Sequence, residues 1–290
     1  MTDGLVVVDK PGGLTSHDVV SRVRRLAGTR KVGHAGTLDP MATGVLVLGV
    51  NRATRLLGHL MLTEKRYDAT IRLGVATTTD DAEGEVLATV STEGLDEATI
   101  RAAAAEFVGE LMQVPTAVSA IKVDGKRAHQ RVRDGEDVEL AARPVTVHEL
   151  VVHRVSTGST TDVDISVRCS SGTYIRAIAR DLGARLQVGG HLSALRRTAV
   201  GPYDLAVAHT LDELAEAPPG ELSTLLPIAE AARAAFPALD LDEAHATDVR
   251  YGRALDLELA GLTAVFAPDG QFLALYEPRG GVAKATAVFV

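Results

Sequence analysis

The chain has 290 residues and a formal net charge of −8, with 46% hydrophobic and 23% charged residues. These values are typical of a globular protein with a large core and exclude wholesale disorder. The single cysteine, Cys169, excludes an internal disulfide framework, and no apolar run approaches the roughly 20 residues that span a bilayer. Because the N-terminus also lacks a basic-then-apolar leader pattern, we expect a cytoplasmic protein without a membrane partner.

The charge is distributed unevenly along the chain. Residues 203–290 hold 14 Asp/Glu and 5 Lys/Arg, whereas the other 202 residues hold 24 acidic and 25 basic side chains. Two basic groups lie in that larger part, at Arg22, Arg24, Arg25, Arg30 and Lys31 and at Lys122, Lys126, Arg127, Arg131 and Arg133. Cationic patches for nucleic acid are therefore available, although composition alone does not indicate RNA.

The N-terminal region predicts a strand, a helix and a second strand. Gly4–Val8 is a short apolar strand, and Ser16 is expected to cap a helix that ends at Gly28. Residues 33–49 form a polar, glycine-rich loop that breaks into an apolar strand over Val45–Val50. Asn51 is expected to cap a further helix that reaches about Leu60.

Asp39 stands in that glycine-rich loop, directly before Pro40. An Asp before Pro often only caps a turn. A carboxylate on a rigid loop beside a buried strand is also well placed for chemistry. The residues alone leave both interpretations open.

The middle of the chain alternates strands and helices. Lys65–Gly74 predicts a strand, and Thr77–Glu85 a solvated loop or hairpin without the spacing of a calcium loop. Asp96 is expected to cap a helix that reaches about Phe107. Val145–Val155 and Thr161–Cys169 alternate apolar and polar residues and predict a hairpin.

Three further expectations concern this region and the C-terminus. Thr173 is expected to begin a helix that Gly189 and Gly190 stop. His148 and His153, five residues apart on one strand, should face opposite sides of it and so not share a metal. After Phe236-Pro237 the chain predicts a small, strand-rich domain with a hairpin turn at Asp269-Gly270.

Four segments resemble one enzyme family. Gly33-His34-Ala35-Gly36-Thr37-Leu38-Asp39-Pro40-Met41-Ala42-Thr43-Gly44 closely resembles the active-site motif of the bacterial TruB-type tRNA pseudouridine-55 synthases. The Asp-Lys-Pro turn at 9–11, Lys65-Arg66-Tyr67 and the segment from Cys169 to Arg176 match further motifs in the family's order. With gaps, the resemblance extends over about residues 4–205.

The resemblance implies the site residues. Asp39 would be the catalytic carboxylate, Arg176 the arginine that pairs with it, and Tyr67 the aromatic that stacks on the target base. Without the motifs, Arg176 would be an ordinary helix-face arginine and Tyr67 a core tyrosine. The residues expected to bind substrate RNA or to build the pocket are His34, Leu195, Tyr174, Arg197 and Lys10.

The implied fold is α/β (α+β), a mixed, largely antiparallel sheet with flanking helices, followed by a small β-rich domain. We expect a catalytic domain over residues 1–232 with an RNA-clamping insertion at about 114–144. Residues 233–290 resemble a PUA RNA-binding domain in position and size, although their low basic count argues for a modest role. The insertion carries His129 where the family pattern has an aromatic residue.

The implied reaction is the isomerisation of uridine to pseudouridine at position 55 in the T-loop of tRNA. It breaks the N-glycosidic bond and rejoins the base through carbon, so it requires neither cofactor nor metal. The target base lies inside a folded loop and must be flipped out. Asp39 could attack C1′ or remove the C2′ proton, and the sequence does not choose between these.

Other functions are possible for such a chain. A tRNA-binding or folding chaperone with a dead site is one, although Asp39, Tyr67 and Arg176 are all present. A glycosidase needs a second carboxylate, and none accompanies Asp39 in its motif. A guide-RNA-dependent relative would need partner proteins, whereas we expect a monomer that acts on the T-arm of tRNA without one.

Overall fold

The computed structural model describes residues 3–117, 122–123, 126–127, 140–218, 220–222 and 224–290. The chain divides into two compact units. Unit 1 comprises Met1–Asp39, Gly44–Met61 and Val200–Val290. Unit 2 comprises Pro40–Thr43 and Leu62–Ala199.

The core of unit 1 is the antiparallel pair of β1 (Gly4–Lys10) and β3 (Thr43–Val50), which are in register from Gly4↔Val50 to Lys10↔Gly44. β14 (Leu226–Pro227) extends the sheet beside β1, and β2 (Val32–His34) pairs with β3. Both long strands are almost fully buried, which explains their continuous apolar sequences. The strands predicted at Gly4–Val8 and Val45–Val50 are confirmed.

The helix after β1 is confirmed with a different cap. α1 (Ser16–Leu26) begins after Thr15, whose side chain accepts a hydrogen bond from the Asp18 amide while Asp18 bonds back to Thr15. Ser16, predicted as the cap, is the first helical residue. Thr15 is the true cap because this reciprocal capping box satisfies two exposed amides. Gly28 follows the helix at φ +63°, as its predicted stop requires.

Asn51 does not cap the next helix, contrary to our expectation. It adopts φ +53° as the first residue of a 3₁₀ turn, η1 (Asn51–Arg55), ahead of α2 (Leu57–Leu60). Its side-chain oxygen instead accepts a hydrogen bond from the Thr29 hydroxyl at 2.9 Å. Asparagine tolerates the left-handed region better than most residues, which suits it to this sharp exit from β3.

The rest of unit 1 is short elements and a small C-terminal sheet. The short elements that precede the C-terminal sheet are β13 (Tyr203–Asp204), η2 (Leu205–Val207), α6 (Leu211–Ala215) and α7 (Ile228–Ala235). The C-terminal sheet has the order β15-β16-β17-β18, and α8 (Glu243–Arg250) follows its first strand. The strands are β15 (Ala238–Asp240), β16 (Thr263–Phe266), β17 (Phe272–Arg279) and β18 (Val282–Val288).

The predicted small β domain is therefore present, and Gly270 at φ +84° forms its expected hairpin turn. This sheet does not pack only on itself. Phe266, Phe272 and Phe289 belong to one buried apolar cluster with Leu5 of β1 and Ala231 of α7. The predicted boundary between residues 232 and 233 thus crosses a shared core.

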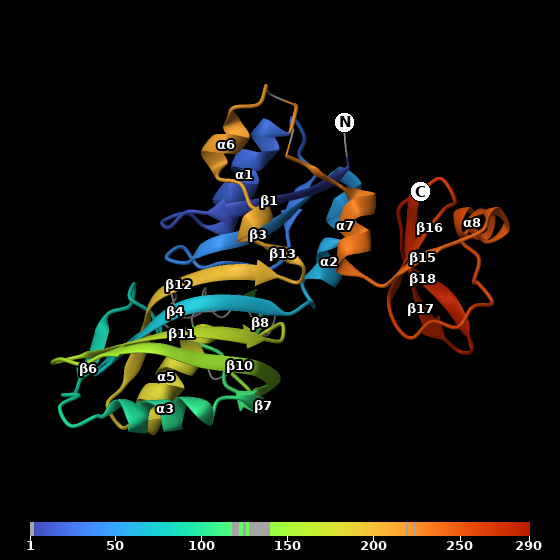
Figure 1. Ribbon diagram of the computed structural model, residues 1–290. Coiled ribbons are helices and arrows are strands. Elements are labelled where there is room, and N and C mark those ends of the chain that lie inside the picture. The colour runs from blue at the N-terminus through green and yellow to red at the C-terminus, as the bar shows by residue number, and fades with distance from the viewer. Residues whose placement is uncertain (1–2, 118–121, 124–125, 128–139, 219, 223) are drawn as a thin grey trace. The chain divides into compact units, whose positions relative to one another are not determined.

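The long strands of unit 2 pair in the order β12-β4-β11-β10-β7. The strands are β4 (Lys65–Leu73), β7 (Gly109–Gln113), β10 (Arg143–Ser156), β11 (Thr161–Cys169) and β12 (Gly190–Val200). α3 (Glu97–Ala105) and α5 (Ile175–Arg185) cover one face, here called the inner face (Figure 1). The predicted strand at 65–74, the hairpin at 145–169 and the Asp96 cap are confirmed.

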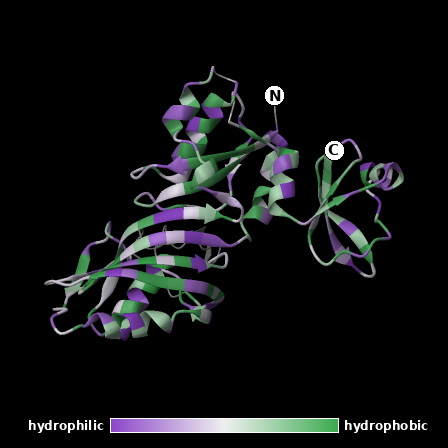
Figure 2. Cartoon of the chain, in the orientation of Figure 1, coloured by the Kyte–Doolittle hydropathy of each residue, from purple (hydrophilic) through white to green (hydrophobic). Residues whose placement is uncertain are grey.

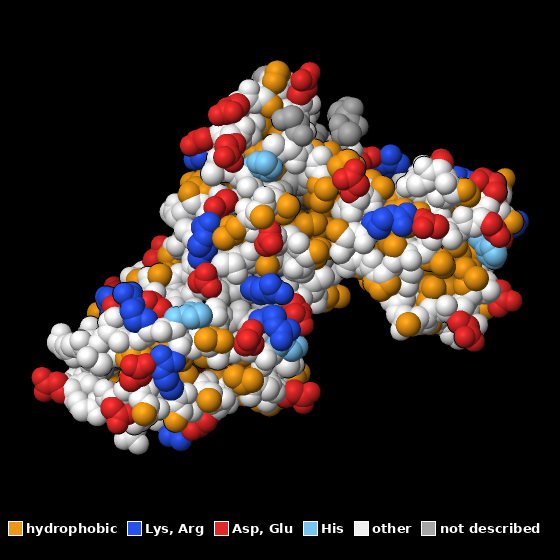
Figure 3. All heavy atoms as spheres, viewed as in Figure 1, with side chains coloured by type: hydrophobic (Ala, Val, Ile, Leu, Met, Phe, Trp, Pro, Cys, Tyr) orange, Lys and Arg blue, Asp and Glu red, His pale blue; other side chains and the backbone are white. Residues whose placement is uncertain are grey.

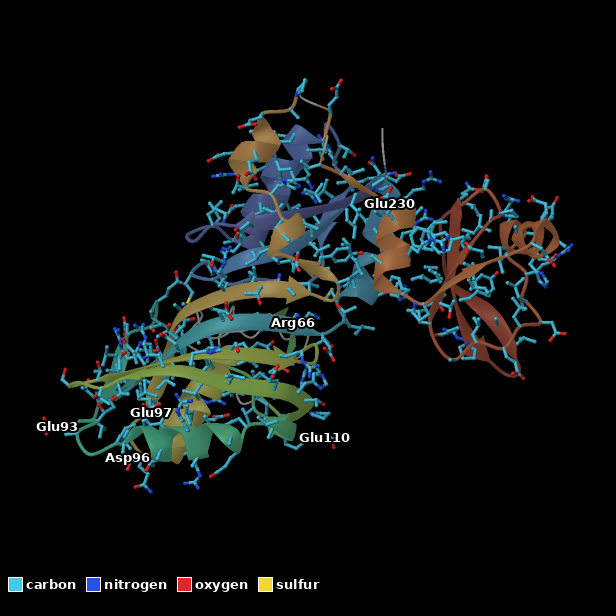
Figure 4. All side chains as sticks on the ribbon, viewed as in Figure 1. Arg66, Glu93, Asp96, Glu97, Glu110 and Glu230 are labelled. Carbon is cyan, nitrogen blue, oxygen red and sulfur yellow. The ribbon has the colours of Figure 1, made fainter. Side chains whose placement is uncertain are left out.

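Alternation along β4 and β11 separates the two faces of this sheet. Tyr67 and Ile71 lie on the inner face in the main apolar cluster of unit 2, whereas Arg66 and Arg72 lie on the outer face. Figure 2 shows the corresponding alternation of hydrophobic and hydrophilic residues, and Figure 4 labels Arg66 on β4. Charged side chains of both signs gather over the outer face (Figure 3).

The predicted placement of the two histidines of β10 is wrong. The register of β10 against β11 shifts between Val147 and Glu149 and again between Val152 and Arg154. Each shift inserts an extra residue, so the side-chain alternation resets at His148 and at His153. Both side chains lie on the outer face, where His148 approaches Glu64 at 3.2 Å and His153 bonds Ser166 at 2.9 Å.

The remaining expectations on unit 2 are partly met. β5 (Val75–Thr77) and β6 (Val86–Thr89) form the predicted hairpin. α5 ends at Arg185, and Gln187 at φ +61° turns the chain two residues before Gly189. Of the predicted insertion, β8 (Lys122–Val123) and β9 (Lys126–Arg127) pair as short strands, and His129 lies outside the described residues.

Candidate active site

The loop that carries Asp39 connects β2 to β3 and is fixed from two sides. The Ala35 amide donates to Val47 O at 2.9 Å, which holds the start of the loop against β3. Ser16 of α1 holds the other side: its hydroxyl donates to Leu38 O at 3.0 Å and accepts from the Leu38 amide at 2.8 Å. Ser16 is 3% exposed, so these bonds are shielded from water. The residue before Asp39 is therefore held rigidly.

Two glycines give this loop its path. Gly36 and Gly44 adopt φ +94° and +97°, in the left-handed region that other residues avoid. The chain passes from unit 1 into unit 2 directly after Asp39, since Pro40–Thr43 belongs to unit 2. The glycine spacing of the motif therefore has a local structural reason, independent of any resemblance.

Two other predicted residues of unit 1 lie near the ends of its strands. Lys10 is fully buried at the end of β1, and its ammonium donates to Pro11 O at 2.9 Å and to Leu14 O at 2.7 Å. These bonds close the turn that leads into α1. His34 is the last residue of β2 and pairs in register with Leu48. Lys10 thus stabilises the turn between β1 and α1.

In unit 2, Arg176 lies in the first turn of α5 and is 5% exposed. Its guanidinium donates to Thr79 O at 2.9 Å and approaches the Asp81 carboxylate at 3.1 Å. Both side chains are almost completely buried, at 6% and 4% exposure. The pair fixes the arginine between α5 and the loop after β5.

Asp81 is the residue that sequence reasoning missed. We predicted a solvated loop or hairpin at 77–85. The hairpin is present, yet Asp81 in it is buried and also accepts hydrogen bonds from the Thr79 hydroxyl at 2.5 Å and the Glu83 amide at 3.1 Å. A run of acidic residues gives no signal that separates one buried partner from exposed neighbours. The partner arginine is almost a hundred residues away in the sequence.

The neighbouring Asp80 is strained and partly desolvated. It adopts φ +60°, and its carboxylate lies 3.3 Å from the Arg180 guanidinium. Burial raises the pKa of Asp80, against the opposing effect of Arg180 and Arg176. Asp81 and Asp80 thus pair with Arg176 and Arg180, which lie four residues apart on α5.

Tyr67 and Tyr174 are positioned differently. Tyr67, 8% exposed, packs on the inner face of β4 with Cys169 and Ile175 in the main cluster of unit 2. Tyr174 precedes α5, and Gln113 of β7 bonds both of its backbone groups, at 2.8 Å to the amide and 3.1 Å to the carbonyl. Gln113 therefore fixes the start of the helix that carries Arg176, and it is a second residue that sequence reasoning missed.

Two buried cations accompany Tyr67. Lys65 lies two residues before it on the same face, and burial, together with the charge of Arg197, lowers the pKa of Lys65 to about 8. Arg197 of β12 is itself only 2% exposed. The Lys65 ammonium donates to Thr63 O at 2.5 Å. Two buried cationic side chains, Lys65 and Arg197, therefore lie close enough to affect each other's charge beside Tyr67.

Leu195, the predicted apolar contact of the base, lines a hollow of about 540 Å³ in unit 2. Met41 and Thr43, from the segment that follows Asp39, line the same hollow, and Arg196 donates to the Thr43 hydroxyl at 3.3 Å. Leu195 and the end of the predicted motif are thus brought together within unit 2. The described residues contain no group of His, Cys, Asp and Glu arranged to hold a metal ion.

Comparison with known proteins identifies the family. Residues 24–175 match the family model of the TruB pseudouridylate synthase N-terminal domain. Residues 176–223 match the model of the tRNA pseudouridylate synthase B C-terminal domain, and residues 236–290 that of the tRNA pseudouridine synthase II C-terminus. The chain belongs to the TruB family of pseudouridylate synthases.

TruB relatives match the chain over its whole length. The tRNA pseudouridine synthase B of Arthrobacter sp. (strain FB24) is 58% identical over 302 residues, covering 100% of this chain and 97% of the relative. The tRNA pseudouridine synthase B of Thermobifida fusca (strain YX) is 58% identical, and the match covers 100% of this chain and 99% of the relative. The resemblance drawn from four motifs is therefore confirmed by the whole chain.

The fold matches solved pseudouridine synthase structures. A Cbf5–Nop10–Gar1 complex contains a chain that superposes with a TM-score of 0.75 at 25% identity, covering 99% of this chain and 85% of that one. The corresponding chain of an H/ACA ribonucleoprotein bound to substrate RNA gives 0.73 at 24% identity, with the same coverage. No described helix has the length and apolarity that a membrane crossing requires.

Proposed function

We propose that this TruB-family chain converts uridine to pseudouridine at position 55 in the T-loop of tRNA. The observation that carries the proposal is the complete motif at 33–44 on a loop that Ser16 and two left-handed glycines hold in place. Relatives of the same length and 58% identity are tRNA pseudouridine synthases. The enzyme is thus an isomerase acting on tRNA.

Asp39 is the proposed catalytic carboxylate. It acts on the ribose of a flipped uridine, either by attacking C1′ or by removing the proton from C2′. Either step breaks the N-glycosidic bond and needs an ionised carboxylate in a water-poor site. A rigid loop suits this role because the reacting atoms must meet within a few tenths of an ångström.

Arg176 and Tyr67 complete the proposed catalytic set. Arg176 supplies a cation that keeps the catalytic carboxylate ionised, and its buried pair with Asp81 holds the guanidinium in one orientation. Tyr67 stacks on the flipped base, as an aromatic beside cations is suited to do. Leu195, Tyr174, His34, Arg197 and Lys10 are proposed to shape the pocket and contact the RNA.

The substrate and the setting are part of the same proposal. The chain accepts the T-arm of tRNA as a monomer in the cytoplasm, without a protein partner or guide RNA. The C-terminal PUA-like sheet has few cations and plays a modest role. The solved Cbf5 structures are complexes, so an assay with the purified single chain distinguishes the two modes of action.

The test is tritium release from unmodified tRNA that carries 5-tritiated uridine, with the purified chain alone. Release of one tritium per tRNA, with the product mapped to the T-loop, is the expected result. Binding of tRNA without release would contradict the proposal and favour the alternative of a tRNA-folding chaperone. That alternative is not favoured, because the predicted catalytic residues are all present and the relatives are synthases.

A further inference from the structure

A second hollow lies in unit 1, at the end of β3 that is opposite to Asp39. It has a volume of about 590 Å³. Three cations, two neutral polar residues and one acid line it: Lys31, Arg52, Arg55, Thr29, Asn51 and Asp3. Among the described residues, the lining contains no apolar or aromatic side chain, so these residues offer no surface on which a base could stack. Its chemistry suits a phosphate group.

Hydrogen bonds position the two arginines of this hollow, but its single acid does not balance its three positive charges. Arg52 donates to Asp3 at 2.6 Å and to Phe289 O at 2.9 Å, and its side chain remains 53% exposed. Arg55 donates to Val288 O at 2.7 Å, which carries no charge. The Lys31 side chain is exposed and makes no hydrogen bond or ion pair within the described residues. Three positive charges thus face one negative charge.

The walls of the hollow are rigid. The Asn51 amide donates to Lys31 O at 2.8 Å, and the Asn51 side chain accepts from Thr29 at 2.9 Å. Both segments continue directly from paired strands, since Val32 and Val50 are partners in register. A preformed group of cations binds an anion without the entropy cost of assembling it.

The surrounding sequence is the positively charged part of an acidic protein. Residues 1–61 hold eight Lys/Arg and four Asp/Glu, whereas the whole chain has a net charge of −8. Phosphate contacts by Lys and Arg supply most of the sequence-independent affinity of proteins for nucleic acid. An enzyme with this overall charge must therefore concentrate its cations where the substrate backbone runs.

The position of the hollow separates it from the proposed chemistry. β3 has eight residues between the Asp39 loop and Asn51, which at about 3.3 Å per residue places the hollow about 25 Å from the start of the strand. A mononucleotide held at Asp39 cannot reach it. A polyanion with phosphates over that distance can, which favours RNA over a small anion.

We infer that the hollow lined by Lys31, Arg52 and Arg55 binds backbone phosphate of the substrate RNA, outside the loop that holds the target uridine. This inference rests on the proposed function. The contact does not read sequence, so it raises affinity for every accepted tRNA equally. It also makes substrate binding dependent on salt through these residues.

The test uses Lys31→Gln, because Arg52 and Arg55 also bond the backbone at the C-terminus, whereas the Lys31 side chain makes no hydrogen bond or ion pair in the part of the chain that the structure describes. We expect KM for full-length tRNA to rise about threefold to tenfold with kcat within about twofold. The slope of log KM against log salt should fall by about 1. Lys31→Arg keeps the positive charge, so its KM and its salt slope should equal those of the wild type. Lys31→Gln with Arg55→Gln should lower the slope by about 2.

The matched control is Arg154→Gln, which removes one positive charge from the outer face of unit 2, where Asp164 pairs with it at 2.8 Å. It should leave KM and the salt slope unchanged. If Lys31→Gln and the double variant keep the wild-type KM and slope, the inference is wrong. A wild-type chain that forms no pseudouridine would instead contradict the proposed function, so the two failures are distinguishable.

Discussion

At the scale of single residues, the buried pair of Arg176 and Asp81 has the largest energetic consequence. The two side chains are 6% and 4% exposed, so the loss of either charge removes an ion pair that is shielded from water. The arginine is proposed to act in catalysis, and the aspartate positions it. Stability and activity should therefore both depend on Asp81.

We predict that Asp81→Asn lowers the free energy of unfolding by about 3–5 kcal/mol, because it removes the charge of the buried carboxylate that pairs with the Arg176 guanidinium. Urea denaturation measures the loss. The matched control is Glu106→Gln, which breaks the exposed pair with Arg185 and should change the free energy of unfolding much less. Equal losses in the two variants would show that the Asp81 pair is not desolvated in solution.

Lys65 provides a prediction on pH. Its folded pKa is lowered to about 8, chiefly by burial, from an unfolded value of about 10.4. Between these values the folded state binds fewer protons than the unfolded chain, so the free energy of unfolding contributed by this group rises with pH. The destabilisation is fully present below about pH 8 and is lost as the pH approaches about 10.4.

The measurement compares wild type with Lys65→Met from pH 7.5 to pH 10, so that other titrating groups cancel. The stability of wild type relative to the variant should increase steadily across this range. A difference that stays constant with pH would show that the Lys65 ammonium is solvated in the folded protein.

At the scale of elements, α1 and the Asp39 loop are joined through adjacent residues with separate tasks. Thr15 caps the helix, and Ser16 bonds both backbone groups of Leu38. A change of Thr15 should affect the stability of α1, and a change of Ser16 should affect the geometry of the Asp39 loop. The pair therefore separates stability from catalysis.

We predict that Ser16→Ala lowers kcat about tenfold, because two shielded hydrogen bonds beside Asp39 are worth about 1–1.5 kcal/mol of positioning. Thr15→Ala should instead cost about 1 kcal/mol of stability with little change in kcat. Tritium release and thermal unfolding measure the two effects. A normal kcat in Ser16→Ala would exclude the positioning role.

Most single elements could be predicted from the sequence, because hydrophobic period and turn residues act locally. β1 follows from its continuous apolar run, and β4, α3 and the β10–β11 hairpin follow from alternation and caps. The errors arise where a nonlocal or reciprocal bond decides the outcome. Thr15 caps α1 because Asp18 bonds back to it, and two bulges turn His148 and His153 to one face.

The candidate site could be predicted only in part, and for a similar reason. The motif residues follow from resemblance, and the positive φ of Gly36 and Gly44 agrees with their spacing. The supporting residues Asp81, Gln113 and Ser16 carry no local signal. Each acts through a partner that is distant in the sequence, so only the fold shows them.

At the scale of the whole molecule, the C-terminal sheet shares a core with the N-terminal strands of unit 1. Phe272 lies between Phe266 and Phe289, with ring centroids 5.4 Å and 4.6 Å away, in the cluster that contains Leu5 and Ala231. Arg233 of α7 also stacks on Phe266, 3.9 Å from the ring centroid. Folding of the two regions should therefore be coupled.

We predict that Phe272→Ala lowers the free energy of unfolding by about 3–5 kcal/mol and raises hydrogen exchange in β1 and α7 as well as in β16–β18. Leu273→Ala is the control, since Leu273 packs in the separate cluster of the C-terminal sheet. Its effect on exchange should stay within that sheet. Unchanged exchange in β1 and α7 of Phe272→Ala would contradict the coupling.

The central claim is that Asp39 performs the chemistry of an RNA-modifying isomerase. The most direct measurement is single-turnover tritium release from 5-tritiated tRNA by wild type, Asp39→Asn and the control Glu106→Gln, which alters an exposed pair with Arg185, with tRNA binding measured in parallel. We predict that Asp39→Asn binds tRNA but loses a factor on the order of 10⁴ or more in rate, while the control retains the wild-type rate. Release by Asp39→Asn at the wild-type rate would contradict the account.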